Sequence, residues 1–269
     1  MTEESEPIVV PVPDHDPIII LEAPTVELID SMGTDNSIVR SARVSVTGEQ
    51  TQDGFPDPLA VFVGALTEED AELMTKRAKG LINYLMRERH GSVFEHNSMT
   101  FYVKGNIFSI REFMRHRIGF SYNERSGRYS KLQPEFWIPS VDRPLINIGT
   151  SSKPEMAPGT GEQYDATVAL MTESYEVAWA AYEKMLANGI ANEVARAVLP
   201  LGIYTEMYVT MNLRSALSFL ALRTHEPTAK HISRPQLEIE EIAREIEREV
   251  ARLFPVAYES WVKNGRVAP

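Results

Sequence analysis

Apolar residues recur every three or four positions along several stretches of this chain, and that spacing constrains its fold most. The longest stripe runs over residues 164–185 and ends before Asn188-Gly189, a common helix stop. Thr67, which precedes Glu68-Glu69-Asp70, and Asn106 are suited to cap two shorter helices. The same periodicity predicts helices over 67–89, 107–114, 192–199, 213–223 and 239–253.

Fewer segments alternate between apolar and polar residues, which is the period of a β-strand. Residues 26–30 and 99–104 have this pattern, and Asp35 is suited to cap a short helix that follows the first of them. Few strands among many helices predict an α+β fold.

Two segments are rich in helix breakers. Residues 1–24 hold five prolines among acidic residues, so we expect a mobile N-terminal arm in which 18–21 can form an edge strand. Residues 139–161 hold four prolines and three glycines and are predicted to be a loop. Because no repeat or low-complexity linker divides the rest, residues 25–269 are predicted to form a single domain.

The composition excludes several classes of protein. The 269 residues include no cysteine, so the chain has no disulfide, no thiolate zinc site and no thiolate nucleophile. A net charge of −11 argues against binding to nucleic acid or an anionic membrane. The N-terminal region has no apolar run long enough to span a bilayer, and its acidic start is unlike a signal peptide, so we expect a cytoplasmic protein.

One short region reverses the charge of the chain. Residues 111–128 hold five arginines and two glutamates, and none of the cations is a lysine. An arginine-rich stretch is often a solvated helix face with ion pairs one turn apart. Arginine, however, binds phosphate or carboxylate through two parallel hydrogen bonds, and the polar run 121–128 adds hydroxyl, amide and backbone donors. We therefore favour a site for a small anionic molecule.

Other motifs are weaker. Two histidines and a glutamate lie within residues 90–96, but the H-E-x-x-H spacing of a zinc helix is absent, and we predict no metal site. Gly159-Thr160-Gly161 begins like a dinucleotide fingerprint, yet Tyr164 stands where the third glycine belongs and no strand precedes it.

The string from Arg115-His116-Arg117 to Ser126-Gly127-Arg128 strongly resembles the signature of the flavin-dependent thymidylate synthases. That signature is an R-H-R triplet followed by seven residues, a serine, another residue and an arginine. Here eight residues separate Arg117 from Ser126, so the loop is one residue longer. Further segments similar to the family's motifs are 39–45, 90–96, 195–200, 212–215 and 222–223.

This resemblance implies a central, mostly antiparallel sheet flanked by several long helices. It also implies an enzyme of thymidylate biosynthesis, a methyltransferase that converts dUMP to dTMP with methylenetetrahydrofolate as one-carbon donor and FAD, reduced by NADPH, as hydride carrier. The absence of cysteine agrees with a route that needs no thiolate to activate the uracil ring. In this family the sites form between the chains of a homotetramer.

The resemblance assigns roles to residues of this chain. It implies that Arg223 is catalytic, at the edge of the uracil. Glu112 and Ser218 stand where many members have Gln and Asn. The implied dUMP ligands are Glu112, Arg115, Glu124, Arg125, Ser126, Gly127, Arg128, Arg196 and Arg223. The implied FAD ligands are Ser45, Ser92, Glu95, Arg115, His116, Arg117, Asn123, Glu124, Asn212, Arg214 and Ser218.

Two alternatives remain open at this point. A nucleotide- or RNA-binding module without redox chemistry would use the same arginine-rich helix, and its binding would depend steeply on salt. A structural oligomer with a solvated arginine face would bind no ligand.

Overall fold

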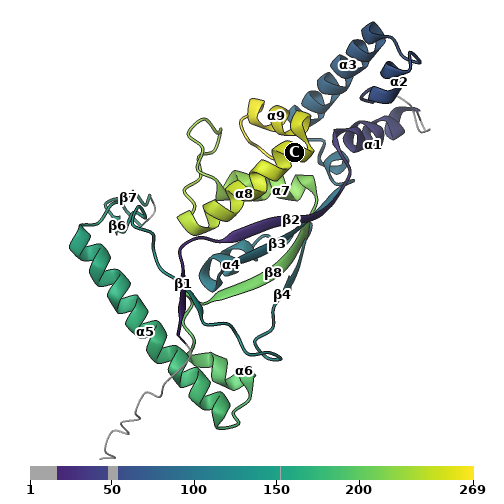
Figure 1. The fold of residues 1–269 in the computed structure, drawn as a ribbon. Helices are drawn as coiled ribbons and strands as arrows, with labels where there is room; N and C mark the ends of the chain where they lie inside the picture. The colour runs from purple at the N-terminus through teal and green to yellow at the C-terminus, as the bar shows by residue number, and fades with distance from the viewer. Residues whose placement is uncertain (1–16, 48–53, 152) are drawn as a thin grey trace, which may run out of the picture. The chain divides into compact units, whose positions relative to one another are not determined.

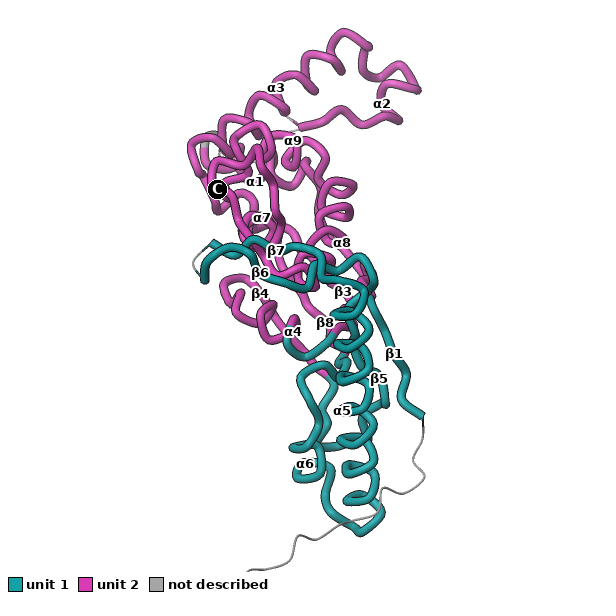
Figure 2. The backbone as a smooth tube through the Cα atoms, turned by 90° about the vertical axis from the view of Figure 1, so that its left-hand side faces the viewer, with its two compact units in different colours: residues 1–23, 106–108, 125–205 teal, residues 24–105, 109–124, 206–269 magenta. Residues whose placement is uncertain are grey.

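The computed structural model describes residues 17–47, 54–151 and 153–269. The chain forms two compact units, drawn in different colours in Figure 2. Unit 1 comprises residues 1–23, 106–108 and 125–205, and unit 2 comprises residues 24–105, 109–124 and 206–269. Most of the predicted N-terminal arm lies outside the described residues, and the prediction of one domain over 25–269 stays a prediction.

Unit 2 is built around a sheet that has four strands in the described part of the chain, in the order β2-β3-β8-β4. Strand β2 (Thr25–Met32) is antiparallel to β3 (Ser98–Asn106), and β4 (Phe120–Glu124) is antiparallel to β8 (Tyr204–Met211). The two strands expected from alternation, 26–30 and 99–104, are confirmed as β2 and β3. Strands β4 and β8 were not predicted.

The apolar stripes of two helices complete the core of unit 2. Helices α7 (Leu213–Arg223) and α8 (Leu237–Leu253) pack against each other on one side of the sheet (Figure 1). On α8, Ile239, Ile242, Ile246 and Val250 are fully buried, as their spacing predicts. The described helices that belong wholly or mainly to unit 2 are α1 (Asp35–Thr47), α2 (Pro58–Phe62), α3 (Glu68–Arg87), α4 (Ile107–Phe113), α7 (Leu213–Arg223), α8 (Leu237–Leu253) and α9 (Pro255–Lys263), together with the 3-10 turn η1 (Gly91–Phe94).

Helix caps are a second test of the sequence predictions. The hydroxyl of Thr67 accepts from the backbone N–H of Asp70 at 3.1 Å and begins α3, as predicted. The prediction for Asp35 is wrong: its carboxylate does not cap its own helix. It accepts from the N–H groups of Val256 and Ala257 at 2.9 and 3.0 Å and so caps α9. Pro255 is the first residue of α9.

Unit 1 is organised by the long helix α5 (Gly161–Ala187), which begins with a capping box of Thr160 and Gln163. Tyr175, Trp179 and Tyr182 of α5 pack with Phe136 of β5 (Glu135–Trp137) in a separate core. Strand β1 (Ile19–Leu21) runs parallel to β5, which confirms a strand in this segment. Downstream of α5 lie the short helix α6 (Asn192–Ala195) and the 3-10 turn η2 (Arg196–Val198).

The predicted loop over 139–161 contains a small hairpin. Strands β6 (Ile146–Asn147) and β7 (Met156–Ala157) pair antiparallel, so this prediction holds apart from two two-residue strands. Across the described ranges, none of the helices combines the length and the apolar character needed to cross a membrane.

The Asp35 cap predicts a local weak point. We expect Asp35→Ala to lower the free energy of unfolding by about 1–2 kcal/mol, because two N–H groups at the start of α9 lose their acceptor. Burial raises the pKa of Asp35, so these hydrogen bonds are what stabilise its charged form. Chemical denaturation measures the change. The control is Asp30→Ala, which removes an exposed carboxylate bonded to its neighbour Ser31; equal losses in both variants would contradict the assignment.

Candidate active site

Unit 2 contains a cavity of about 1080 Å³. Its walls come from the turn after α4, the first turns and outer face of α7, the segment before β3, and the last two residues of the chain. The lining residues are Arg89, Glu95, Arg115, His116, Arg117, Ile118, Gly119, Phe120, Asn212, Arg214, Ser215, Ser218, Ala221, Leu222, Ala268 and Pro269. The charged lining residues include four arginines and one glutamate, so the cavity wall is mainly cationic.

The turn after α4 is held by backbone and tyrosine hydrogen bonds. The N–H of His116 donates to Phe113 O at 3.0 Å, and the Tyr122 hydroxyl donates to His116 O at 2.6 Å. Gly119 has a φ of +72°, and a Cβ there would lie 2.1 Å from Ser215 Oγ. Because that hydroxyl donates to Ile118 O at 2.9 Å, the turn and the start of α7 are joined at a position that requires glycine.

The start of α7 presents polar groups to the cavity. Asn212 is the N-cap, and its side chain accepts from the N–H of Ser215 at 2.9 Å. Arg214 donates from Nε to Pro269 O at 2.7 Å and forms an ion pair with Glu95. The buried amide of Asn97 accepts from the N–H of Leu213 at 2.6 Å, which fixes the first turn of the helix from the sheet side.

Arg223 lies at the other end of α7, in contact with two predicted site residues. Its Nη1 forms an ion pair with Glu112 of α4, and its Nε donates to His116 Nε2 at 3.0 Å. Burial, followed by the charges of Arg223 and Arg115, lowers the pKa of His116 to about 4. A neutral imidazole is therefore the acceptor for Arg223 near neutral pH.

A second group of predicted residues lies together in unit 1. Gly127 is buried, and a Cβ there would lie 3.3 Å from Arg196 Cδ, so the two residues are neighbours. The N–H of Arg128 donates to Ser126 Oγ at 3.3 Å, and its Nε pairs with exposed Glu193 at 2.9 Å. Arg125 donates to Lys131 O at 3.2 Å. The exposed guanidinium of Arg128 beside the Ser126 hydroxyl can bind an anion.

The structure thus sorts the predicted residues into groups. Seven of the proposed flavin ligands line the cavity: Glu95, Arg115, His116, Arg117, Asn212, Arg214 and Ser218. Four others lie in unit 2 but do not line it: Ser45 on α1, Ser92 in η1, and Asn123 and Glu124 on β4, all exposed.

Sequence reasoning missed several lining residues. Arg89 lines the cavity and has a φ of +60°. Its position directly before the histidine segment 90–96, together with its positive charge, is a sequence signal that could have found it. Ala268 and Pro269 carry no reactive group, and no local pattern could have placed them in the wall.

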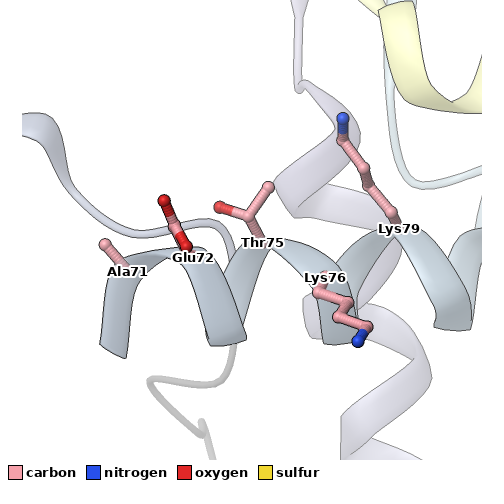
Figure 3. A pocket seen from close by; sticks show the side chains of 5 residues that line it. All are labelled: Ala71, Glu72, Thr75, Lys76 and Lys79. Atoms are coloured by element: carbon pink, nitrogen blue, oxygen red, sulfur yellow. The ribbon is translucent and has the colours of Figure 1, made fainter. Parts of the chain in front are cut away.

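A separate hollow of about 450 Å³ runs along α3. Figure 3 shows its lining side chains, Ala71, Glu72, Thr75, Lys76 and Lys79, which all come from one helix, with Lys76 and Lys79 pointing to opposite sides. Its polar groups do not converge on a common point, and none of the predicted site residues lines it.

Comparison with known proteins decides the family. A family model described as "Thymidylate synthase complementing protein" matches residues 27–256. The chain belongs to the flavin-dependent thymidylate synthase family. A flavin-dependent thymidylate synthase from Streptomyces coelicolor is 49% identical over 259 residues, with 96% of this chain and 99% of that protein covered. One from Tropheryma whipplei is 44% identical over 94% of this chain and 98% of its own length.

Solved structures have the same fold as this chain. Two crystal structures of a UMP/dUMP methylase, PolB from Streptomyces cacaoi, superpose with TM-scores of 0.80 and 0.82 at 40% and 41% identity. Each superposition covers 94% of this chain. It covers 99% of the PolB chain in the structure bound with 5-Br UMP and 100% in the structure bound with 5-Br dUMP. The predicted α+β fold with a mostly antiparallel sheet and several helices is confirmed.

The flavin-dependent thymidylate synthase family implies FAD, and the cavity residues fit such a group. Arg115, Arg117 and Arg214 supply cationic donors for a pyrophosphate, and Asn212 and Ser218 supply neutral polar groups. Gly91 lets the Arg214 guanidinium lie against the backbone, since a Cβ at this position would lie 2.4 Å from Arg214 Cζ. The volume and the donor set both suit a large, anionic, partly aromatic ligand.

His116 predicts a pH dependence of stability. Its pKa is lowered to about 4 in the folded protein. The unfolded chain therefore takes up this proton near its ordinary pKa of about 6.5, and folding stability falls as the pH drops from there toward 4. We expect the free energy of unfolding to fall less over this interval in His116→Gln than in wild type. Denaturation at several pH values measures this, with His231→Gln, at an exposed position, as control. Parallel curves for all three proteins would contradict the prediction.

Proposed function

We propose that this chain methylates dUMP to dTMP, with methylenetetrahydrofolate as one-carbon donor and FAD, reduced by NADPH, as hydride carrier. The observation that supports this best is the cavity of unit 2, where the Arg115-His116-Arg117 turn meets α7 beside Arg223. The membership of the family and its many relatives named flavin-dependent thymidylate synthase agree with the same reaction.

The nucleotide phosphate is assigned to Ser126, Gly127 and Arg128, with Arg115 and Arg196 contributing. Arginine suits this role because its fork donates two parallel hydrogen bonds to a phosphate. Arg128 exchanges its exposed partner Glu193 for the phosphate, and such surface pairs are worth little, so the exchange costs about 0–1 kcal/mol. Glu112, Glu124 and Arg125 complete the proposed dUMP site.

Arg223 acts on the uracil. A guanidinium at the ring edge stabilises the ionised form of the base, which makes C5 a better nucleophile without a protein thiolate. Neutral His116 orients Arg223 by accepting from Nε, which leaves other guanidinium N–H groups for the ring. Glu112 pairs with Arg223 and holds it in place before the nucleotide binds.

FAD is assigned to the cavity residues, together with Ser45, Ser92, Asn123 and Glu124. When bound, the reduced flavin supplies the hydride that turns the transferred methylene into a methyl group. Arg115, Arg117 and Arg214 hold its anionic part, and Asn212 and Ser218 form neutral hydrogen bonds. As in the family, we assign a homotetramer with sites shared between chains, and a cytoplasmic location.

Substrate choice requires its own test, because PolB is titled a UMP/dUMP methylase. The assay therefore offers dUMP and UMP separately, with methylenetetrahydrofolate, FAD and NADPH. We expect a yellow protein and dTMP formed in proportion to the NADPH consumed. A protein that stays colourless after reconstitution with FAD and desalting would favour the non-redox binding module instead.

Arg223→Ala is expected to lower kcat for dTMP formation by roughly 10²–10³-fold or more, because a charge that stabilises the ionised ring is lost. The visible spectrum of bound FAD should be unchanged. Arg234→Ala, at an exposed arginine outside the cavity, is the matched control. Unchanged turnover in Arg223→Ala would remove Arg223 from the catalytic role.

Arg128→Ala is expected to weaken dUMP binding by about 1.5–3 kcal/mol, the value of a lost charge-assisted hydrogen bond. Titration calorimetry of the FAD-loaded protein measures the affinity. Glu193→Gln, which breaks the same ion pair but leaves the arginine, should change it by less than about 1 kcal/mol. If both variants bind dUMP as wild type does, Arg128 lies outside the phosphate site.

A further inference from the structure

A buried guanidinium outside the proposed site links two segments of unit 2. Arg266 follows α9, has a φ of +58° and is 6% exposed. Its Nη2 lies 2.6 Å from Glu247 Oε1 and donates to Thr224 Oγ1 at 2.9 Å. Its guanidinium carbon lies 4.2 Å from the centroid of the Trp261 ring. An ion pair, a hydrogen bond and a cation–π contact therefore hold one side chain.

Thr224 connects Arg266 to the proposed catalytic group. It is the residue directly after Arg223 and is 2% exposed. Its hydroxyl donates to Leu220 O at 2.7 Å, and its own N–H donates to the same oxygen at 3.1 Å. Since the hydroxyl proton is used toward Leu220, its oxygen is free to accept from Arg266. The final turn of α7, from which Arg223 projects, is thus tied to Arg266.

Glu247 of α8 keeps Arg266 in position. The Tyr258 hydroxyl donates to Glu247 Oε1 at 2.8 Å, and Arg244 Nη1 donates to Oε2 at 3.0 Å. An ion pair in a protein interior loses its hydration, and a protein in which apolar residues of similar size replace the pair is often equally stable or more stable. A stabilising role alone therefore explains this pair poorly, whereas a requirement for a fixed direction explains it well.

The same arginine is close in sequence to the cavity wall. Ala268 and Pro269, two and three residues beyond it, line the cavity, and Pro269 O accepts from Arg214. The preceding residue, Gly265, accepts from the N–H of Lys230, which ties the segment after α7 to the same place. Arg266 thus contacts the end of α7 and lies two residues before the final residues of the wall.

We propose that Arg266 is a positioning residue for the methylation: held by Glu247, it fixes Thr224 and thereby the direction in which Arg223 projects toward the uracil. The inference rests on the proposed role of Arg223. It adds a residue that touches neither dUMP nor FAD and that acts through the hydroxyl of Thr224.

The test compares Thr224→Val, which keeps the shape but loses the hydroxyl, with Thr224→Ser, which keeps the hydroxyl. We expect Thr224→Val to lower kcat by about tenfold or more, since displacing a reacting group by 1 Å can cost about 10²-fold. Thr224→Ser should stay within about twofold of wild type, because the contact to Arg266 is retained. KM for dUMP and the spectrum of bound FAD should change little in both. If Thr224→Val does not fold, the smaller Thr224→Ala replaces it.

Thr67→Ala is the control for stability. It removes the N-cap hydrogen bond of α3 but none of the contacts among Arg266, Glu247 and Thr224, so its melting temperature should fall while kcat stays near wild type. A normal kcat in Thr224→Val would overturn the proposal, as would a loss of kcat in Thr224→Ser equal to that in Thr224→Val. It is also overturned if the loss of kcat in every variant is proportional to its loss of melting temperature. Wild-type turnover and Arg223→Ala test the proposed function separately.

Discussion

The stack of Phe113 on Phe219 is the contact on which the cavity of unit 2 depends. The two ring centroids lie 4.4 Å apart, the planes differ by 19°, and both side chains are fully buried. Phe113 ends α4 and Phe219 lies on α7, so the stack sets the separation between the Arg115-His116-Arg117 turn and the helix that ends at Arg223. His116 packs edge-on against Phe219 with centroids 5.0 Å apart, which extends this aromatic packing to the charged groups.

Charge acts at two ranges in this protein. The net charge of −11 repels anions at a distance, but salt screens such a field over about 8 Å at physiological ionic strength. Arginines in a partly dehydrated cavity act at contact distance, where screening is weak and bidentate hydrogen bonds are available. An acidic protein can therefore bind small anionic ligands while it disfavours long polyanions.

Local patterns predicted the elements that bury one face, such as β3 and α8, because burial imposes a period on the sequence. They also predicted the arginine-rich turn, whose chemistry is visible in consecutive residues. Strand β8 was missed although Met207, Val209 and Met211 alternate inward, so its signal was present. The target of Asp35 and the wall formed by Pro269 had no local signal, because each depends on a partner far away in the sequence.

The cap of α9 by Asp35 has a consequence for how unit 2 is assembled. The bond to Val256 joins residues 221 positions apart, and the ends of so long a loop must meet before the contact contributes any stability. Contacts of high sequence separation slow folding, because the chain loses conformational entropy before these contacts contribute any stabilising energy. During synthesis α1 emerges long before its partner exists. Unit 2 therefore cannot reach its final packing until nearly all of its residues have left the ribosome.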